Sequence, residues 1–214
     1  MAGPGRSVDP PAWAAITGLP YRVRVADFEQ VHPETRAEWR AWLAANHATR
    51  PGVWLLQWRT PTGRRRLDYH EAVEEALCFG WIDSLAKRLD DERSMITMTP
   101  RKPAGGWSRS NKERLERLTA AGLMTPSGLQ AVAVAKANGA WELLDDVEAL
   151  VVPPDLTAAL ARDSAAVAGF ATMTPSAKKA ILLALATAKK PETRARRIAA
   201  AVAEATALER RPAR

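Results

Sequence analysis

The chain has 214 residues, 47% of them hydrophobic, and a formal net charge of +7 at neutral pH. This length and apolar fraction predict a folded globular protein with one core or two small ones. No apolar run approaches the ~18 residues that a membrane span needs, and the N-terminus lacks the apolar stretch of a signal peptide. We therefore expect a cytoplasmic protein without a membrane span.

Residues 1–20 are rich in Pro, Gly and Ala and predict a flexible arm. Residues 21–28 alternate in polarity, which favours a strand. Pro33 suits the first position of a helix, and residues 52–58 form a β-rich run. A return strand over 64–67 would complete a hairpin.

The next segment carries clear boundary signals. Asp68 and Glu71 form a capping pattern that predicts a helix over 69–79, and Gly80 suits the position just after its end. Residues 81–86 and 94–99 predict two antiparallel strands, joined by an acidic turn at 90–92.

From Ser108 onward the sequence predicts only helices. Ser108 or Ser110 would cap the first of them, and prolines at 126, 154, 175 and 191 suit the first turns of others. The fold class that we predict is α+β, with an N-terminal antiparallel sheet packed with helices, followed by an all-helical C-terminal half. We expect an α+β domain over 21–123 and a helical region over 124–210.

Positive charge is concentrated at the C-terminus. Residues 1–175 hold 21 basic and 21 acidic residues, whereas 176–214 hold 10 basic and 3 acidic residues. A solvated terminal helix explains this distribution, and so does a patch that binds nucleic acid or another anionic surface. Both interpretations stay open, with nucleic acid the less favoured partner.

Two carboxylates and the single thiol share one face of the predicted 69–79 helix. Glu71, Glu75 and Cys78 follow each other at helical spacing. If the face is buried, the pKa of one carboxyl rises unless a base such as Arg101 or Lys102 lies nearby, so the pair is a candidate for general acid/base catalysis. The alternative is an exposed acidic stripe, with Cys78 a small core residue.

Asp83 is a third candidate acid/base residue. On the predicted strand it shares a face with Trp81, where it would bond Arg101 or the indole of Trp107, or form a buried ion pair that fixes the strand register. The chain has eight tryptophans, and Trp81 together with four earlier ones suits either a core or the wall of a pocket for a planar or cationic ligand.

The segment at 101–112 combines bases with a helix start. Arg101 and Lys102 precede Ser108 and the backbone N–H groups of a helix N-terminus, an arrangement that suits carboxylate or phosphate. A plain flexible loop is the alternative. We predict ligand-binding roles for Trp81, Arg101, Lys102, Trp107, Ser108, Asn111 and Lys112.

No metal or cofactor motif is visible. The histidines at 32, 47 and 70 form no metal-spaced pair, and the sequence has neither a GxGxxG nor a GxxxxGK[ST] pattern. A single cysteine excludes an internal disulfide framework. We expect no metal and no cofactor.

Several of these segments together resemble a bacterial family. The chain is similar to the bacteriocin-protection, YdeI or OmpD-associated family over about residues 28–205. The blocks that carry the resemblance are EAVEEALCFGWIDS at 71–84, DDER at 90–93, TPRKP at 99–103, WSRSNKERLERL at 107–118, GLMTPSGLQA at 122–131, PPDL at 153–156 and KKPETRARRI at 189–198. The resemblance implies a role in stress or antimicrobial resistance and no established reaction.

Three hypotheses follow. The first is a stress or resistance protein that binds a small, anionic or aromatic ligand in a Trp-lined seam between 71–84 and 101–112. The second is an enzyme that uses Glu71, Glu75 or Asp83 as a general acid or base on a small substrate. The third is binding of nucleic acid or an anionic surface by the basic C-terminal helix.

Overall fold

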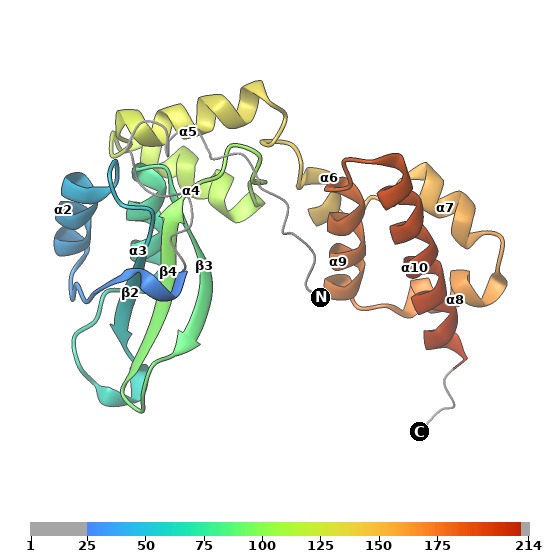
Figure 1. The fold of residues 1–214 in the computed structure, drawn as a ribbon, viewed down its shortest axis with the longest axis horizontal. Coiled ribbons are helices and arrows are strands. Elements are labelled where there is room, and N and C mark those ends of the chain that lie inside the picture. Colours follow the sequence, from blue (N-terminus) through green and yellow to red (C-terminus); the bar gives the residue numbers. More distant parts are fainter. Residues whose placement is uncertain (1–24, 211–214) are drawn as a thin grey trace, which may run out of the picture. The chain divides into compact units, whose positions relative to one another are not determined.

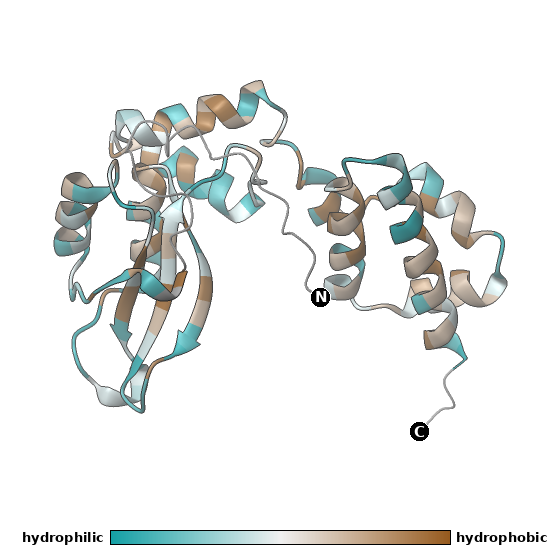
Figure 2. Ribbon diagram, in the orientation of Figure 1, coloured by the Kyte–Doolittle hydropathy of each residue, from teal (hydrophilic) through white to brown (hydrophobic). Residues whose placement is uncertain are grey.

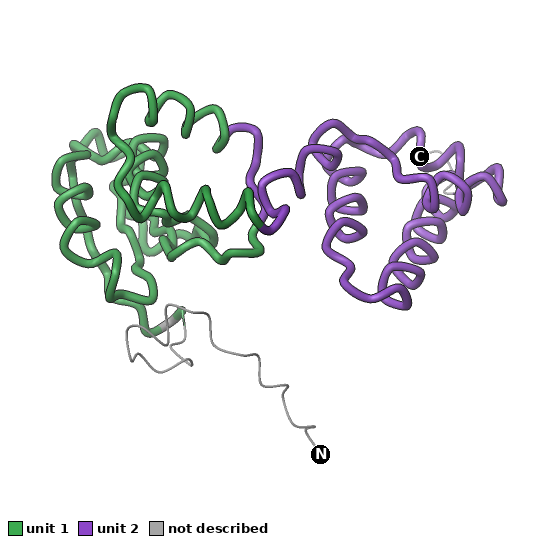
Figure 3. Tube along the Cα trace, turned by 90° about the horizontal axis from the view of Figure 1, so that it is seen from above, with its two compact units in different colours: residues 1–105, 111–137 green, residues 106–110, 138–214 purple. Residues whose placement is uncertain are grey.

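The computed structural model describes residues 25–210, which form two compact units (Figure 3). The first unit contains residues up to 105 together with 111–137, and the second contains 106–110 together with residues from 138 onward. The predicted α+β class is confirmed, with a sheet and helices in the N-terminal part and only helices in the C-terminal half. The predicted arm at 1–20 lies outside the described residues, as does 21–24 of the predicted strand; Val25–Asp27 is a 3-10 turn.

The first unit is built on a four-stranded sheet of order β1-β2-β4-β3 (Figure 1). Its strands are β1 (Glu29–Val31), β2 (Val53–Trp58), β3 (Trp81–Arg88) and β4 (Arg93–Pro100). The predicted antiparallel pair β3–β4 is confirmed, β2 pairs antiparallel with β4, and β1 joins the edge in parallel. A return strand at 64–67 was expected, and that expectation is wrong. β4 pairs with β2 instead, and its four central residues, 95–98, are all buried.

The two faces of the sheet have separate cores. Val53, Leu55 and Met98 are fully buried on one face, the side that carries helices α2 (Arg36–Asn46) and α3 (Tyr69–Cys78). On the opposite face Trp54, Leu56 and Met95 form a smaller buried cluster, against which Phe28 packs. Because successive side chains of a strand point to opposite faces, one set packs on the side of α2 and α3 and the other set forms the smaller cluster.

Capping residues set the ends of these two helices. Helix α2 begins at Arg36 and not at Pro33 as predicted, because the Thr35 side chain caps it by accepting a hydrogen bond from the Glu38 amide. Asp68 caps α3 through the His70 amide, and Gly80 follows the helix with a φ of 74°. Both predicted ends of α3 are therefore confirmed. Only glycine adopts that left-handed conformation without strain, so the chain can turn directly into β3.

The first unit also contains α5 (Pro126–Ala137) and, from residue 111 onward, α4 (Arg109–Ala120). The start of α5 is tied to the end of α3, because the amide and hydroxyl of Thr125 both donate to the Cys78 carbonyl. A Cβ atom on Gly128 would lie 2.2 Å from the same carbonyl oxygen. Glycine is thus required for this close approach of α5 to α3.

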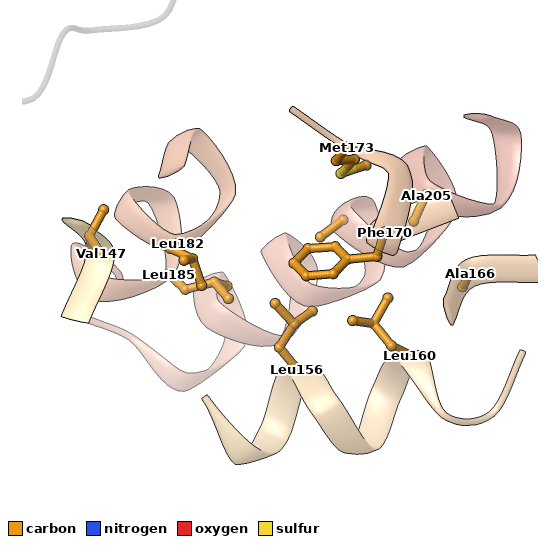
Figure 4. Close-up of a cluster of buried hydrophobic side chains, with 10 residues drawn as sticks. Val147, Leu156, Leu160, Ala166, Phe170, Met173, Leu182, Leu185 and Ala205 are labelled. Atoms are coloured by element: carbon orange, nitrogen blue, oxygen red, sulfur yellow. The ribbon is translucent and has the colours of Figure 1, made fainter. Parts of the chain in front are cut away.

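The second unit is a helical bundle of α6 (Asp145–Glu148), α7 (Pro154–Leu160), α8 (Ser164–Thr172), α9 (Pro175–Ala186) and α10 (Pro191–Glu209). Phe170 lies at the centre of its core, among aliphatic side chains from four of these helices (Figure 4). Gly169 allows α8 and α10 to cross closely, because a Cβ there would lie 1.9 Å from the Ala205 carbonyl oxygen.

Part of the positive charge of α10 is used inside this bundle. Arg194 donates to both oxygens of Asp155, and Arg197 donates to the Ala184 carbonyl near the end of α9.

In the first unit, hydrophilic residues, drawn in teal, gather at the β3–β4 turn (Figure 2). Among residues 25–210 no helix has both the length and the apolar character to cross a membrane.

The contact between α5 and α3 predicts an unusual response to mutation. Gly→Ala inside a helix ordinarily stabilises a protein by roughly 0.5–1 kcal/mol, but Gly128→Ala forces a methyl group against the Cys78 carbonyl. We expect it to lower the free energy of unfolding by about 2 kcal/mol in urea denaturation. Gln130→Ala, at an exposed position of the same helix, is the control and should change it by less than about 0.5 kcal/mol. A stabilised Gly128→Ala variant would contradict this packing.

Candidate functional site

Glu75 is a buried carboxylate held by two arginines. Its side chain is 2% exposed. Arg36 Nε donates to one oxygen at 2.6 Å and Arg40 Nη1 to the other at 2.6 Å, both from α2. Arg36 also bonds Glu74, which in turn accepts from Arg117 of α4 at 3.1 Å. Charged hydrogen bonds therefore join α2, α3 and α4.

This network gives Glu75 a structural role. The sequence suggested Arg101 or Lys102 as the base beside a buried carboxylate, whereas Arg36 and Arg40 are the residues in contact with it. Both carboxylate oxygens accept hydrogen bonds from cationic donors. An oxygen that is already paired in this way is poorly placed to take a proton from a substrate.

Cys78 lies next to the network and is fully buried. Burial and the neighbouring Glu75 raise the pKa of its thiol, while a hydrogen bond from Arg40 opposes the rise. A raised pKa and a closed environment keep the sulfur protonated and unreactive. These properties fit the interpretation of Cys78 as a small core residue.

Glu71 is separate from this network. It is half-buried on the first turn of α3, and its side chain makes no hydrogen bond or ion pair with any residue in the described part of the chain. Glu71 and Glu75 therefore do not share a base, although helical spacing places them on one face. An acid/base role for Glu71 stays a prediction.

Asp83 forms a hydrogen bond with a residue that the sequence did not single out. Tyr69, the first residue of α3, donates its hydroxyl to Asp83 Oδ2 at 2.8 Å. Burial, followed by this hydrogen bond, raises the pKa of the phenol to about 12. Tyr69 is thus a neutral donor at physiological pH, and it leaves the other oxygen of Asp83 without a partner among residues 25–210.

Arg101 lies within electrostatic range of Asp83. Its guanidinium is half-buried just after β4, and burial lowers its pKa to about 10, with the Asp83 charge acting in the opposite direction. It therefore remains protonated at neutral pH. Asp83 and Arg101, which the sequence predicted to bond, thus interact through the attraction of their charges.

Arg114 of α4 is the second guanidinium near Tyr69. Its Nη1 donates to Asn111 Oδ1 at 3.0 Å, and its Nη2 lies 3.0 Å from His70 Nδ1. Because an arginine can only donate, His70 Nδ1 is the acceptor and the imidazole proton lies on Nε2. The charge of Arg114 acts on the Tyr69 hydroxyl.

We call Tyr69, His70, Asp83, Arg101 and Arg114 the polar cluster. They come from the start of α3, β3, the end of β4 and α4, and all five lie in the first unit. Tyr69 and His70 are adjacent in sequence, with their rings in edge contact. A carboxylate, a neutral phenol and two guanidinium groups are therefore gathered at one partly exposed surface.

The remaining predicted ligand residues lie elsewhere. Trp81 is 1% exposed, donates its indole N–H to the His47 carbonyl and packs on Trp42, so it belongs to the core. Trp107 is also 1% exposed and packs on Trp141 in the second unit. Ser108 contacts Ser110, Lys102 is exposed in its loop, and Lys112 is half-buried on α4.

The sequence contains partial signals for the arginines that were not predicted. Arg36 and Arg40 recur at a spacing of four residues, and Asn111 and Arg114 at three, so each pair lies on one helical face. Each spacing indicates that two side chains share a helical face. It does not indicate which distant residue that face contacts. Nothing in the spacing of Tyr69 and Asp83 links them.

The polar cluster suits organic ions better than metals. Among residues 25–210, no group of three or more His, Cys, Asp or Glu side chains is placed to hold a metal ion. Guanidinium groups bind carboxylate and phosphate through paired hydrogen bonds, and a carboxylate with an open oxygen accepts from an amine or a hydroxyl. These groups can bind and orient a small charged ligand.

The structural role of Glu75 leads to a stability prediction. Glu75→Gln leaves Arg36 and Arg40 facing a neutral amide, and it should lower the free energy of unfolding by about 2 kcal/mol in urea denaturation. Glu116→Gln removes the same charge at an exposed position on α4, and it should change that free energy by less than about 0.5 kcal/mol. Equal effects of the two substitutions on the free energy of unfolding would contradict a structural role for Glu75.

The Tyr69–Asp83 hydrogen bond predicts a titration. Tyr21 and Tyr69 are the two tyrosines of the chain, so in a Tyr21→Phe background phenolate absorbance reports Tyr69 alone. We expect a midpoint near pH 12, lowered when Asp83→Asn removes the neighbouring negative charge. Circular dichroism over the same range checks that the protein stays folded. A midpoint near 10 in both proteins would contradict the contact.

Comparisons with known proteins separate the two parts of the chain. Residues 31–131 match a family model described as a domain of unknown function, DUF8412. No curated protein and no solved structure matches the chain. The blocks between 71 and 131, including those of the polar cluster, thus fall in the segment matched by the domain of unknown function. Residues 149–207, which hold α7 to α10, match the model described as bacteriocin-protection, YdeI or OmpD-associated, and the predicted resemblance is confirmed for this segment.

Proposed function

We propose that the first unit binds a small anionic ligand at the polar cluster. The observation that carries the proposal is the environment of Arg114, a half-buried guanidinium positioned by Asn111 and His70. Both partners are neutral, and Arg114 forms no ion pair with any residue that the structure describes. A carboxylate or phosphate is the natural complement of this charge.

The contrast with other arginines supports this choice. Arg36, Arg40 and Arg117 each contact a glutamate, and Arg194 contacts Asp155. Those arginines stabilise the fold by pairing with charge inside the protein. Arg114 instead has its orientation set by two hydrogen bonds while its charge is left uncompensated, and Arg101 adds positive charge nearby.

A protective role provides the biological setting of the proposal. The name of the family matched by residues 149–207 refers to bacteriocin protection. For this chain we propose a cytoplasmic stress or resistance protein in which the ligand site lies on the first unit. The predicted Trp-lined seam is thereby replaced with a site lined by charged and phenolic groups, since Trp81 and Trp107 are buried in packing contacts.

An enzymatic role is the second candidate, and Asp83 favours it. The carboxylate is half-buried, one oxygen accepts from Tyr69, and the other is available to accept a proton from a bound molecule. A general base needs such an open oxygen within hydrogen-bond reach of its substrate. Glu75 lacks this property, because Arg36 and Arg40 occupy it. Binding by the basic C-terminal helix is less favoured, because Arg194 and Arg197 already make contacts inside the second unit.

The test measures binding of inorganic phosphate and of simple carboxylates by isothermal titration calorimetry at low ionic strength. Arg114→Gln should weaken binding about tenfold, because a charged hydrogen-bond donor is lost. Arg162→Gln removes one positive charge from an exposed position of the second unit and should leave the affinity unchanged. Equal affinities of wild type and Arg114→Gln would overturn the proposal, and so would an absence of binding by phosphate, simple carboxylates and amino acids alike.

A further inference from the structure

Two opposite charges in the polar cluster, those of Asp83 and Arg114, form no ion pair within residues 25–210, although the charge of Arg101 acts on Asp83 through space. Asp83 forms no ion pair with any residue between 25 and 210, and its single side-chain hydrogen bond comes from the neutral hydroxyl of Tyr69. Arg114 is likewise held only by neutral partners within that range. Folded proteins usually pair half-buried charges of opposite sign when they lie close together, so this separation requires an explanation.

Tyr69 lies between the two charges. Its hydroxyl bonds Asp83, its ring contacts His70, and His70 contacts Arg114. The uncharged phenol therefore bonds the carboxylate and lies within range of the Arg114 charge. The result is a surface with a negative oxygen at one end, a positive fork at the other and an aromatic ring between them.

We propose that the ligand is a zwitterion, whose amino group binds the open oxygen of Asp83 and whose carboxylate binds Arg114. This inference rests on the proposed function and narrows its ligand class from anions to small amino acids. A ligand of this kind satisfies both charges at once and brings no net charge to the surface.

The presence of Asp83 argues against a ligand that is only anionic. A carboxylate bound at Arg114 would be attracted by Arg114 and Arg101 and repelled by Asp83, because like charges disfavour each other. An amino group on the same ligand converts that repulsion into a charged hydrogen bond. Discrimination between amino acids and plain acids is therefore built into the cluster.

The Tyr69 hydroxyl can contribute to this selectivity. It donates its proton to Asp83, so its oxygen lone pairs remain available to accept from an ammonium group bound at the same carboxylate. A bound ammonium would then have two oxygen acceptors, one charged and one neutral. The aromatic ring next to it adds favourable contact with a cationic group.

Matched sets of three probes test the inference by calorimetry with the full chain. Each set holds an ω-amino acid, the carboxylic acid without the amino group and the amine without the carboxylate, for example 4-aminobutanoate, butanoate and butylamine. Sets of increasing chain length allow for the span between Asp83 and Arg114. At the best length we expect the amino acid to bind about tenfold more tightly than either matched monoion.

Asp83→Asn is the decisive variant, because asparagine can still accept from Tyr69 while the charge is lost. It should reduce the affinity for the amino acid to that of the plain carboxylate, and Arg114→Gln should reduce it to that of the amine. If the plain acid binds wild type as tightly as the amino acid at every length, the zwitterion inference is overturned and the anion site stands. If neither these probes nor phosphate bind, both proposals fail.

Discussion

The pairing of Glu75 with Arg36 and Arg40 is the interaction on which the first unit depends. It places a charged group at the contact between α2 and α3, where a core normally holds only apolar side chains. Such a contact is stable only when every charge is paired, which fixes the register of the two helices. Because α3 is held in this way, Tyr69 at its first residue has a defined place beside Asp83.

The polar cluster uses the opposite principle. In the helix contact, positive and negative charges neutralise each other and stabilise the fold. In the cluster, neutral groups orient Asp83 and Arg114, and neither forms an ion pair within residues 25–210, so both remain available to a ligand. The same residue types thus act as structural ties in one place and as a candidate binding surface in another. Whether a charged side chain stabilises the fold or stays available to a ligand therefore depends on its partners and not on its residue type.

Local signals predicted much of the fold and little of the site. Asp68 and Gly80 delimited α3 correctly, because capping and the left-handed conformation depend on neighbouring residues. The return strand expected at 64–67 failed because β2 pairs with β4, some forty residues along the chain. The partners of Glu75 lie 39 and 35 residues away, and Arg114 reaches His70 across 44 residues. Residue spacing within one helix carries no information about such contacts.

In the proposed complex Arg114 binds the ligand, and its guanidinium can be observed directly. The Nε–Hε signal of Arg114 in a nitrogen-15 NMR spectrum is assigned by its absence from Arg114→Gln, and 4-aminobutanoate, or the ω-amino acid of best length, is then added. We expect a saturating shift of this signal, with the signals of Arg36 and Arg40 unchanged because Glu75 holds them. An unchanged Arg114 signal at ligand concentrations where calorimetry detects binding would place the ligand elsewhere and contradict a binding role for Arg114.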